Sequence, residues 1–172
     1  MLCPCGSALS FSQCCQPFIE SEGGRVFPKS AEQLMRSRFS AYATKNGAYI
    51  YHTYADATRV SQSLDDIQQW ANHCLWLALK IRKSTAELVE FSAYYIADNT
   101  LFSLTERSTF VIENGLWRYF NGIIDSHKII AAVKRNDSCP CNNYPTAFTL
   151  RKGMKGKKFK HCCGRINRVQ QP

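Results

Sequence analysis

The sequence contains no long apolar run. Its longest uninterrupted apolar stretches, such as Leu75 to Leu79, are strand-sized, whereas a membrane-spanning helix needs about 18 or more apolar residues. Charged residues are also scarce, at 20%, while aromatic residues are plentiful, with 10 Phe, 8 Tyr and 3 Trp. This composition excludes a largely disordered chain and predicts a soluble protein with a packed core.

A secretory signal is also lacking, because the first residues show no basic segment followed by an apolar one. We therefore expect a cytoplasmic protein, in which a reducing environment disfavours disulfides. The expectation matters because the chain has nine cysteines, four near each end and Cys74 alone between them. Reduced cysteines in clusters favour metal binding over disulfides.

Acidic residues are nearly absent from the C-terminal segment. Residues 134–172 contain ten Lys or Arg and a single acid, Asp137, whereas residues 1–133 contain equal numbers of each sign. The whole formal charge of +9 therefore lies in this segment. Such a segment is attracted to nucleic acid, to an anionic membrane surface or to an acidic protein.

With 172 residues, of which 45% are hydrophobic, the chain suits one domain with two small appendages. Ser30 and Gln33 form a capping box that predicts a helix, which we expect to end at Gly47. A short helix is predicted over 48–54, and a third after Ser63.

Beyond Cys74 the apolar residues alternate with polar ones, which predicts strands. Asp98-Asn99 and Asn114-Gly115 are two-residue hairpin turns of the preferred chemistry. The strands are predicted over residues 75–82, 87–97, 101–113 and 116–123. The fold class is therefore α+β: helices first, then an antiparallel meander sheet with one face covered.

The cysteines near both ends have the spacing of a closed zinc site. Each set has the pattern C-x-C followed by C-C, which supplies four thiolates for a tetrahedral structural site with no open position. Free thiols or a redox pair are the alternative. His161 is a rival ligand beside Cys162. The predicted ligands are Cys3, Cys5, Cys14 and Cys15 at one end and Cys139, Cys141, Cys162 and Cys163 at the other.

These residues carry a family resemblance. Cys3-Pro4-Cys5-Gly6-Ser7 with Cys14-Cys15 resembles the SEC-C motif, the zinc-binding tail of the preprotein-translocase motor ATPase. Residues 135–141 and 156–164 resemble a second copy. Between the copies, residues 31–39, 106–110 and 114–119 look like the middle domain of the YchJ family.

The resemblance implies a cone-shaped, nuclear transport factor 2-like middle domain at 28–133, with its helices followed by a curved meander sheet. Zinc knuckles at 1–19 and 134–167 would flank it and hold one or two zinc ions. In the translocase motor the motif docks the acidic export chaperone SecB, and related copies occur in proteins of the ribosome and export pathway. The resemblance therefore implies a zinc-binding adaptor for an acidic protein partner.

The chain departs from the family pattern in the second copy and in the middle domain. Twenty residues instead of eight separate the second copy's cysteine pairs, and Asn142-Asn143 replaces the usual Gly-Ser. Because asparagine tolerates the left-handed conformation, we expect the turn to survive. Thr53-Tyr54-Ala55 lacks the histidine that family members commonly show at its third position.

The basic residues around the second knuckle predict a docking surface with Phe159 as its apolar anchor. Part of their charge could instead neutralise the zinc–thiolate site, which carries a formal charge of −2. RNA or ribosome binding is an alternative, because basic residues interleaved with Phe159 and Phe148 suit phosphate contact and stacking. The predicted partner-binding residues are Lys157, Lys158, Phe159, Lys160 and Arg165.

Glu106 lies on an otherwise largely apolar strand face, where a carboxylate needs a partner. We expect an ion pair with Arg36 or Arg38 of the first helix. The alternative is a general acid or base in a cone pocket, which would make the middle domain an enzyme or a small-molecule carrier. No nucleophile or further metal motif converges with Glu106, so catalysis is not the favoured hypothesis. Cys74 is predicted to be a packing residue.

Overall fold

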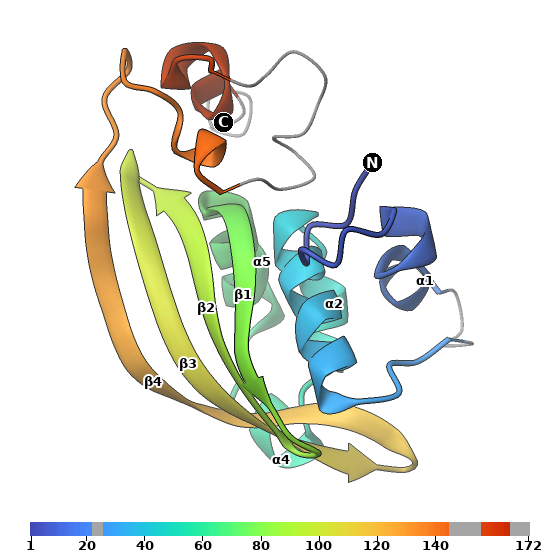
Figure 1. Cartoon of the computed structure of the whole chain (residues 1–172). Helices are drawn as coiled ribbons and strands as arrows, with labels where there is room; N and C mark the ends of the chain where they lie inside the picture. Colours follow the sequence, from blue (N-terminus) through green and yellow to red (C-terminus); the bar gives the residue numbers. More distant parts are fainter. Residues whose placement is uncertain (22–25, 145–155, 166–172) are drawn as a thin grey trace.

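The computed structural model describes residues 1–21, 26–144 and 156–165. Helices lie against one face of a curved antiparallel sheet whose four strands are neighbours in chain order (Figure 1). The N-terminal segment lies beside the longest helix, α2 (Ala31–Ala43), and the C-terminal segment lies at one end of the sheet. Because consecutive strands are neighbours, the predicted α+β class and meander order are confirmed.

Helix α2 (Ala31–Ala43) begins at the predicted capping box. The Ser30 hydroxyl accepts a hydrogen bond from the Gln33 amide at 3.1 Å, and the Gln33 side chain accepts one from the Lys29 amide at 2.6 Å. The predicted end at Gly47 is wrong. Lys45 takes the left-handed conformation (φ 65°) just after the helix, and Gly47 instead opens helix α3.

Three shorter helices follow: α3 (Gly47–His52), α4 (Asp56–Arg59) and α5 (Leu64–His73). The third predicted helix is confirmed, because the Ser63 hydroxyl accepts a hydrogen bond from the Asp66 amide at 3.2 Å. Helix α4 is a single turn that the sequence did not predict, because no side chain caps its start. Lys45 ties α5 to α2 by donating to the carbonyl oxygens of Ala71 and Cys74, both at 2.5 Å.

The sheet consists of β1 (Leu75–Ser84), β2 (Leu88–Ala97), β3 (Thr100–Glu113) and β4 (Leu116–Ala132). Both predicted hairpin turns are confirmed. The turn residues Asp98, Asn99, Asn114 and Gly115 all have positive φ, between 47° and 77°, as a type I′ turn requires.

Strand β4 runs to Ala132, well beyond the predicted end at Ile123. The register between β3 and β4 shifts at three places, and at each the extra residue lies on β4. Such bulges bend a strand and increase its twist, which accounts for the curvature in Figure 1. The bulges and the polar run of residues 125–128 also interrupt the alternation that the sequence prediction relied on.

The main core lies between α2 and the sheet. Its buried members include Leu34, Phe39, Trp76, Tyr95 and Phe110. Cys74 is fully buried among them, so its prediction as a packing residue is confirmed. Two further clusters join the end segments to this domain, one through the N-terminal cysteines and one through the C-terminal cysteines.

Candidate metal centres

The N-terminal cysteines are brought together by a narrow turn and two short helices, η1 (Phe11–Gln13) and α1 (Gln16–Ile19). The Cys3 amide donates to the Leu9 carbonyl at 2.8 Å, and Gly6 turns the chain with a φ of 78°. Phe11 is buried and fixes η1 over the turn. As a result, the C-x-C pair faces the C-C pair.

The four N-terminal sulfur atoms all lie within 4.8 Å of one another. The Sγ of Cys14 is 3.7 Å from that of Cys5 and 3.7 Å from that of Cys15. Zn–S bonds of about 2.3 Å in a tetrahedron place sulfur atoms roughly 3.8 Å apart, so the spacing fits a metal ion. It does not fit a disulfide, whose sulfurs are about 2.05 Å apart.

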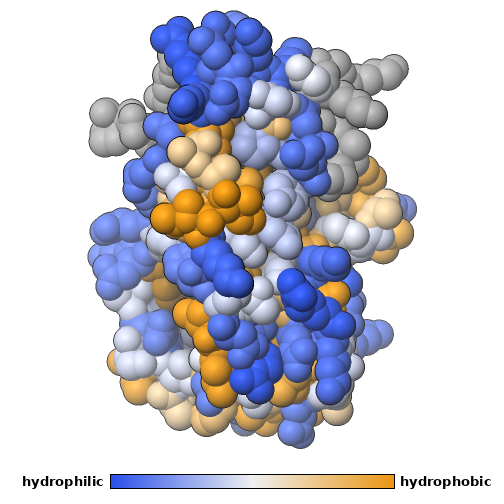
Figure 2. Space-filling view, turned by 60° about the vertical axis from the view of Figure 1, so that its left-hand side comes forward, coloured by the Kyte–Doolittle hydropathy of each residue, from blue (hydrophilic) through white to orange (hydrophobic). Residues whose placement is uncertain are grey.

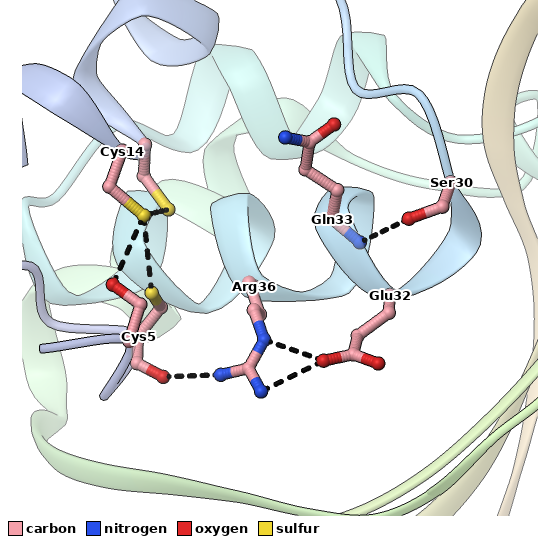
Figure 3. Close-up of polar contacts among 8 residues, drawn as sticks. Cys5, Cys14, Ser30, Glu32, Gln33 and Arg36 are labelled. Atoms are coloured by element: carbon pink, nitrogen blue, oxygen red, sulfur yellow. Dashed lines mark hydrogen bonds and ion pairs between the residues drawn. The ribbon is translucent and has the colours of Figure 1, made fainter. Parts of the chain in front are cut away.

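Arg36 fastens this module to the middle domain (Figure 3). Its guanidinium donates to the Cys5 carbonyl at 3.0 Å and pairs with Glu32, one turn earlier on α2, at 2.8 Å. The expected ion pair between Arg36 and Glu106 is therefore not formed. Arg36 lies on the face of α2 that meets the cysteine module.

The C-terminal cysteines repeat this geometry. Ser138 bridges to Lys158 as Leu2 bridges to Ser10, and η3 (Phe159–His161) precedes Cys162-Cys163 as η1 precedes Cys14-Cys15. The backbone angles agree closely: φ/ψ is −124°/−92° at Cys14 and −131°/−114° at Cys162. The four sulfurs again lie within 4.8 Å, with Cys141 and Cys162 3.4 Å apart.

His161 is not part of this donor set. The four ligand atoms come from Cys139, Cys141, Cys162 and Cys163, all buried, whereas His161 is exposed. The geometry therefore keeps Cys162 in the set. The Sγ atoms form the same closed shell at both ends of the chain.

Asn142 does not take the expected left-handed conformation. It ends the short helix η2 (Pro140–Asn142), with its amide bonded to the Cys139 carbonyl at 2.9 Å. Its side chain donates to the Ser138 hydroxyl at 3.0 Å and accepts from the Gly156 amide at 3.1 Å. A side-chain clamp thus replaces the glycine turn, and it joins the two segments that flank the lengthened loop.

The thiols of each cluster influence one another's ionisation. Hydrogen bonds from Cys15 and then Cys3 lower the pKa of Cys5, whereas hydrogen bonding with Cys3 and Cys5, followed by burial, raises the pKa of Cys15. Four thiolates this close together would repel one another, so a fully deprotonated cluster requires a cation between the sulfur atoms.

Two family descriptions match the chain: "YchJ, middle NTF2-like domain" over residues 30–122 and "SEC-C motif" over residues 2–17. A protein of Vibrio cholerae serotype O1 named UPF0225 protein is 35% identical, with 95% of this chain and 100% of the relative covered. A UPF0225 protein of Actinobacillus succinogenes is 31% identical, with 95% and 96% covered. The chain belongs to the YchJ (UPF0225) family.

Two solved structures share the fold, and both are of SEC-C motif containing proteins. The solution structure from Rhodopseudomonas palustris has a TM-score of 0.65 at 30% identity and covers 73% of this chain and all of its own. The crystal structure from Psychrobacter arcticus has a TM-score of 0.61 at 27% identity and covers 95% of both chains. These matches confirm the nuclear transport factor 2-like middle domain with cysteine clusters near both ends.

The structure places Phe159 inside the molecule. Only 4% of it is exposed, and it belongs to a cluster with Leu75, Leu77, Ile96 and Leu101 at the end of the sheet. The prediction that Phe159 is an exposed anchor for a partner is therefore wrong. An aromatic ring in so small a module is needed to bury the module's own apolar face. Phe148 lies outside the described residues.

Arg38 is also not paired with Glu106. Its guanidinium donates to the Ile50 carbonyl and to the Thr53 hydroxyl, both at 2.7 Å, and lies over the rings of Tyr54 and Tyr119. The predicted ion pair is wrong because backbone carbonyl and π-face partners surround this cation.

Glu106 takes hydroxyl partners instead. Its Oε1 accepts hydrogen bonds from Ser108 at 2.6 Å and from Tyr119 at 2.9 Å. Gly122 makes room for this carboxylate, since a Cβ there would lie 2.1 Å from Oε1. The sequence offered one signal for this arrangement, a glycine inside the predicted strand 116–123.

Two of the cavities formed by the described residues adjoin the middle domain. The larger, about 400 Å³, is walled by residues such as Phe27, Tyr49, His52 and Trp117. The smaller, about 180 Å³, lies in the cone and includes both Arg38 and Glu106 in its wall. Over the described residues, no helix is long and apolar enough to cross a membrane.

Proposed function

We propose that both cysteine clusters hold structural zinc, and that the protein is a cytoplasmic adaptor whose C-terminal module docks onto an acidic protein. The donor chemistry supports zinc, because four thiols at tetrahedral spacing form a closed shell with no position for a substrate. Bound zinc supplies folding free energy to modules that have almost no core of their own.

The observation that carries the docking proposal is the gathering of basic side chains around the C-terminal cluster. Lys158, Arg165 and Arg135 are exposed. Desolvation and, after it, the positive charges of nearby basic side chains lower the pKa of His161, so these cations lie near this residue. The contributing cations are Lys160, Arg165, Lys158 and Arg135. Figure 2 shows that this end of the molecule has a hydrophilic surface.

A protein partner is favoured over RNA by the position of the aromatic rings. Single-stranded RNA binding combines basic side chains with exposed rings on which bases stack. In the described part of the C-terminal module, Phe159 is buried and Tyr144 stacks on Tyr94 with ring centroids 4.5 Å apart. What remains is a charged surface suited to acidic side chains, and the SEC-C resemblance points to the export chaperone SecB.

Metal analysis of the reduced, purified full-length protein tests the zinc assignment. We expect two zinc ions per chain, one for Cys3→Ser and one for Cys139→Ser. Ser61→Ala, at an exposed surface position, serves as the control and keeps both ions. A wild-type protein that contains no zinc, or cysteine variants that retain both ions, would overturn the assignment.

Binding of purified SecB, followed by titration calorimetry at several salt concentrations, tests the docking assignment. The double variant Lys158→Glu/Arg165→Glu should bind at least about tenfold more weakly, and binding should weaken with salt because the charges are exposed. Lys80→Glu/Lys83→Glu, on exposed positions of β1, makes the same charge change elsewhere and should bind normally. Equal binding by both variants, or binding of RNA but not of SecB, contradicts the proposal.

A further inference from the structure

Strand β4 forms one edge of the sheet, and much of its backbone is unpaired on the outside. Up to Phe120 this edge is covered, because the Ala55 amide donates to the Tyr119 carbonyl at 2.8 Å and the Thr58 hydroxyl donates to the Phe120 carbonyl. Within the described part of the chain, the backbone of residues 121–132 forms hydrogen bonds only with β3. A bare edge of this length offers a row of backbone donors and acceptors to another strand.

The side chains along this bare edge are rich in isoleucine. Figure 2 brings the side of the molecule on which β4 runs to the front and shows hydrophobic residues gathered there. The opposite edge strand, β1, carries exposed Lys80, Arg82 and Lys83 instead, and such charges keep edge strands from pairing. The four isoleucines, with exposed fractions from 46% to 70%, are Ile123, Ile124, Ile129 and Ile130.

A row of alternating charges crosses the sheet and ends at β4. Lys83 of β1 lies opposite Glu90 of β2, and Glu90 lies opposite Arg107 of β3. Arg107 in turn pairs with Asp125 of β4 through hydrogen bonds of 2.9, 3.0 and 3.1 Å. The row is therefore basic, acidic, basic and acidic from β1 to β4. Opposite charges stabilise neighbouring strands, so a further strand beside β4 should present a basic residue to Asp125.

β4 itself carries such a basic residue, Lys128, on the same side of the sheet as Asp125. Lys128 lies opposite Ser103, whose neighbours Phe102 and Leu104 pack toward the helices, so Lys128 points to the outer side. Residues three apart in a regular strand lie on opposite sides. Asp125 is the extra residue of a bulge and bonds to Arg107 on the outer side, so the bulge places Asp125 and Lys128 on one side.

The segment around these two charges is self-complementary. Residues 123–130 read Ile-Ile-Asp-Ser-His-Lys-Ile-Ile. In an antiparallel pairing of two copies centred at Ser126 and His127, Asp125 of each copy meets Lys128 of the other, and each pair of isoleucines meets the other pair. A two-fold axis requires this kind of surface, in which the same patch serves both copies.

The isoleucines also fall on matching sides of the strand. Ile124 lies opposite Glu106 and Ile129 lies opposite Phe102, and both of these β3 residues face the helices. Ile124 of one copy would therefore meet Ile129 of the other on the helix side, while the charges meet on the outer side. The pairing would remove apolar surface from water on one side and satisfy charges on the other.

We propose that the chain forms a two-fold homodimer in which the β4 strands of two copies pair antiparallel through residues 121–132. The two sheets become one continuous sheet, and the row of alternating charges continues from Asp125 to the second copy's Lys128. The assembly closes after two copies, because the edges left outside are the β1 edges with their basic residues. The dimer is independent of the zinc and docking assignments, since these β4 residues lie outside both cysteine modules.

Sedimentation equilibrium of the full-length protein tests the charge pairing. The wild-type chain, of 19.6 kDa, should sediment as a dimer. Asp125→Lys and Lys128→Asp each place like charges together twice in the dimer and should weaken dimerisation about tenfold. The double variant Asp125→Lys/Lys128→Asp restores opposite charges and should regain the dimer. Because it keeps a lysine beside Arg107, its recovery cannot come from contacts within one copy.

Ile129→Lys and hydrogen exchange test the edge pairing itself. Ile129 is 70% exposed, so its replacement should leave the fold intact but give a monomer, whereas Val60→Lys, at 86% exposure away from β4, should leave the dimer unchanged. Amides of residues 121–132 that do not bond to β3 should exchange more slowly in the wild-type dimer than in the Ile129→Lys monomer. The proposal is overturned by a wild-type chain that stays monomeric at every concentration, by charge reversals that do not weaken the dimer, or by a dimer whose β4 edge amides exchange as fast as in the monomer.

Discussion

Tyr119 stands between Glu106 and Arg38. Its hydroxyl donates a hydrogen bond to Glu106 Oε1 at 2.9 Å, and its ring lies 4.6 Å from the Arg38 guanidinium. A carboxylate and a cation that the sequence would pair directly are thus linked through one tyrosine. Arg38, Glu106 and Tyr119 all line the cone cavity, so the tyrosine separates the two charged side chains within its wall.

Gly122→Ala should disturb this bridge. The new methyl group would lie 2.1 Å from Glu106 Oε1 and 2.4 Å from the Tyr119 hydroxyl, so both side chains must move and their hydrogen bond is lost. We expect the free energy of unfolding to fall by about 1–3 kcal/mol. Urea denaturation measures the change.

A double-mutant cycle provides the control for this prediction. In a Glu106→Ala background, Gly122→Ala should cost clearly less, because the displaced carboxylate is already gone. Asn121→Ala, at the exposed neighbouring position, should change stability by less than about 0.5 kcal/mol. Fully additive effects of the two substitutions would show that the Gly122 contact is unimportant.

Phe159→Ala should loosen the C-terminal module itself as well as its packing on the sheet, while the middle domain stays folded. Phe159 is 4% exposed, and truncation of a buried phenylalanine typically costs about 3–5 kcal/mol. Hydrogen exchange should therefore become faster at the Cys139 amide, which bonds to the Lys157 carbonyl, but not at amides of β2. Phe120→Ala, with Phe120 at 38% exposure, is the matched control and should leave the Cys139 amide protected.

Alkaline pH should unfold the protein through tyrosines that are buried or half-buried in its core. Burial raises the pKa of Tyr49 and of Tyr95 to about 12, and raises the pKa of Tyr42 and of Tyr119 further, from an ordinary value of 10. A raised pKa in the folded state means that this stability is complete below pH 10 and is lost as pH rises through the folded-state pKa. Each group contributes up to about 1.4 kcal/mol per pH unit in that interval.

Tyrosinate absorbance and circular dichroism, recorded together against pH, test this prediction. Part of the tyrosinate signal should appear only as the protein unfolds above about pH 11. Tyr49→Phe removes the hydroxyl that meets buried Ser37 at 2.7 Å and should make the loss of stability with pH less steep, whereas Tyr51→Phe in the same helix should change the slope less. A folded protein in which all eight tyrosines ionise near pH 10 contradicts the prediction.

Local patterns in the sequence were sufficient for the cysteine sets, the capped helix starts and the two hairpins. The spacing of Cys3, Cys5, Cys14 and Cys15 brings four thiols within reach after one turn, and Asn114-Gly115 suits a conformation that few other pairs adopt. These features depend on residues close together in the chain, so the sequence alone predicts them.

Tertiary structure decided which side chains became partners. The sequence predicted Phe159 to be an exposed anchor, but the end of the sheet covers it. The Arg38 guanidinium contacts a backbone carbonyl oxygen and two tyrosine rings instead of pairing with Glu106. Burial and charge pairing depend on surfaces from distant segments, and long side chains can reach several alternatives at similar cost. The sequence thus determined the two cysteine modules and the order of the elements, while packing determined what Phe159, Arg38 and Glu106 do.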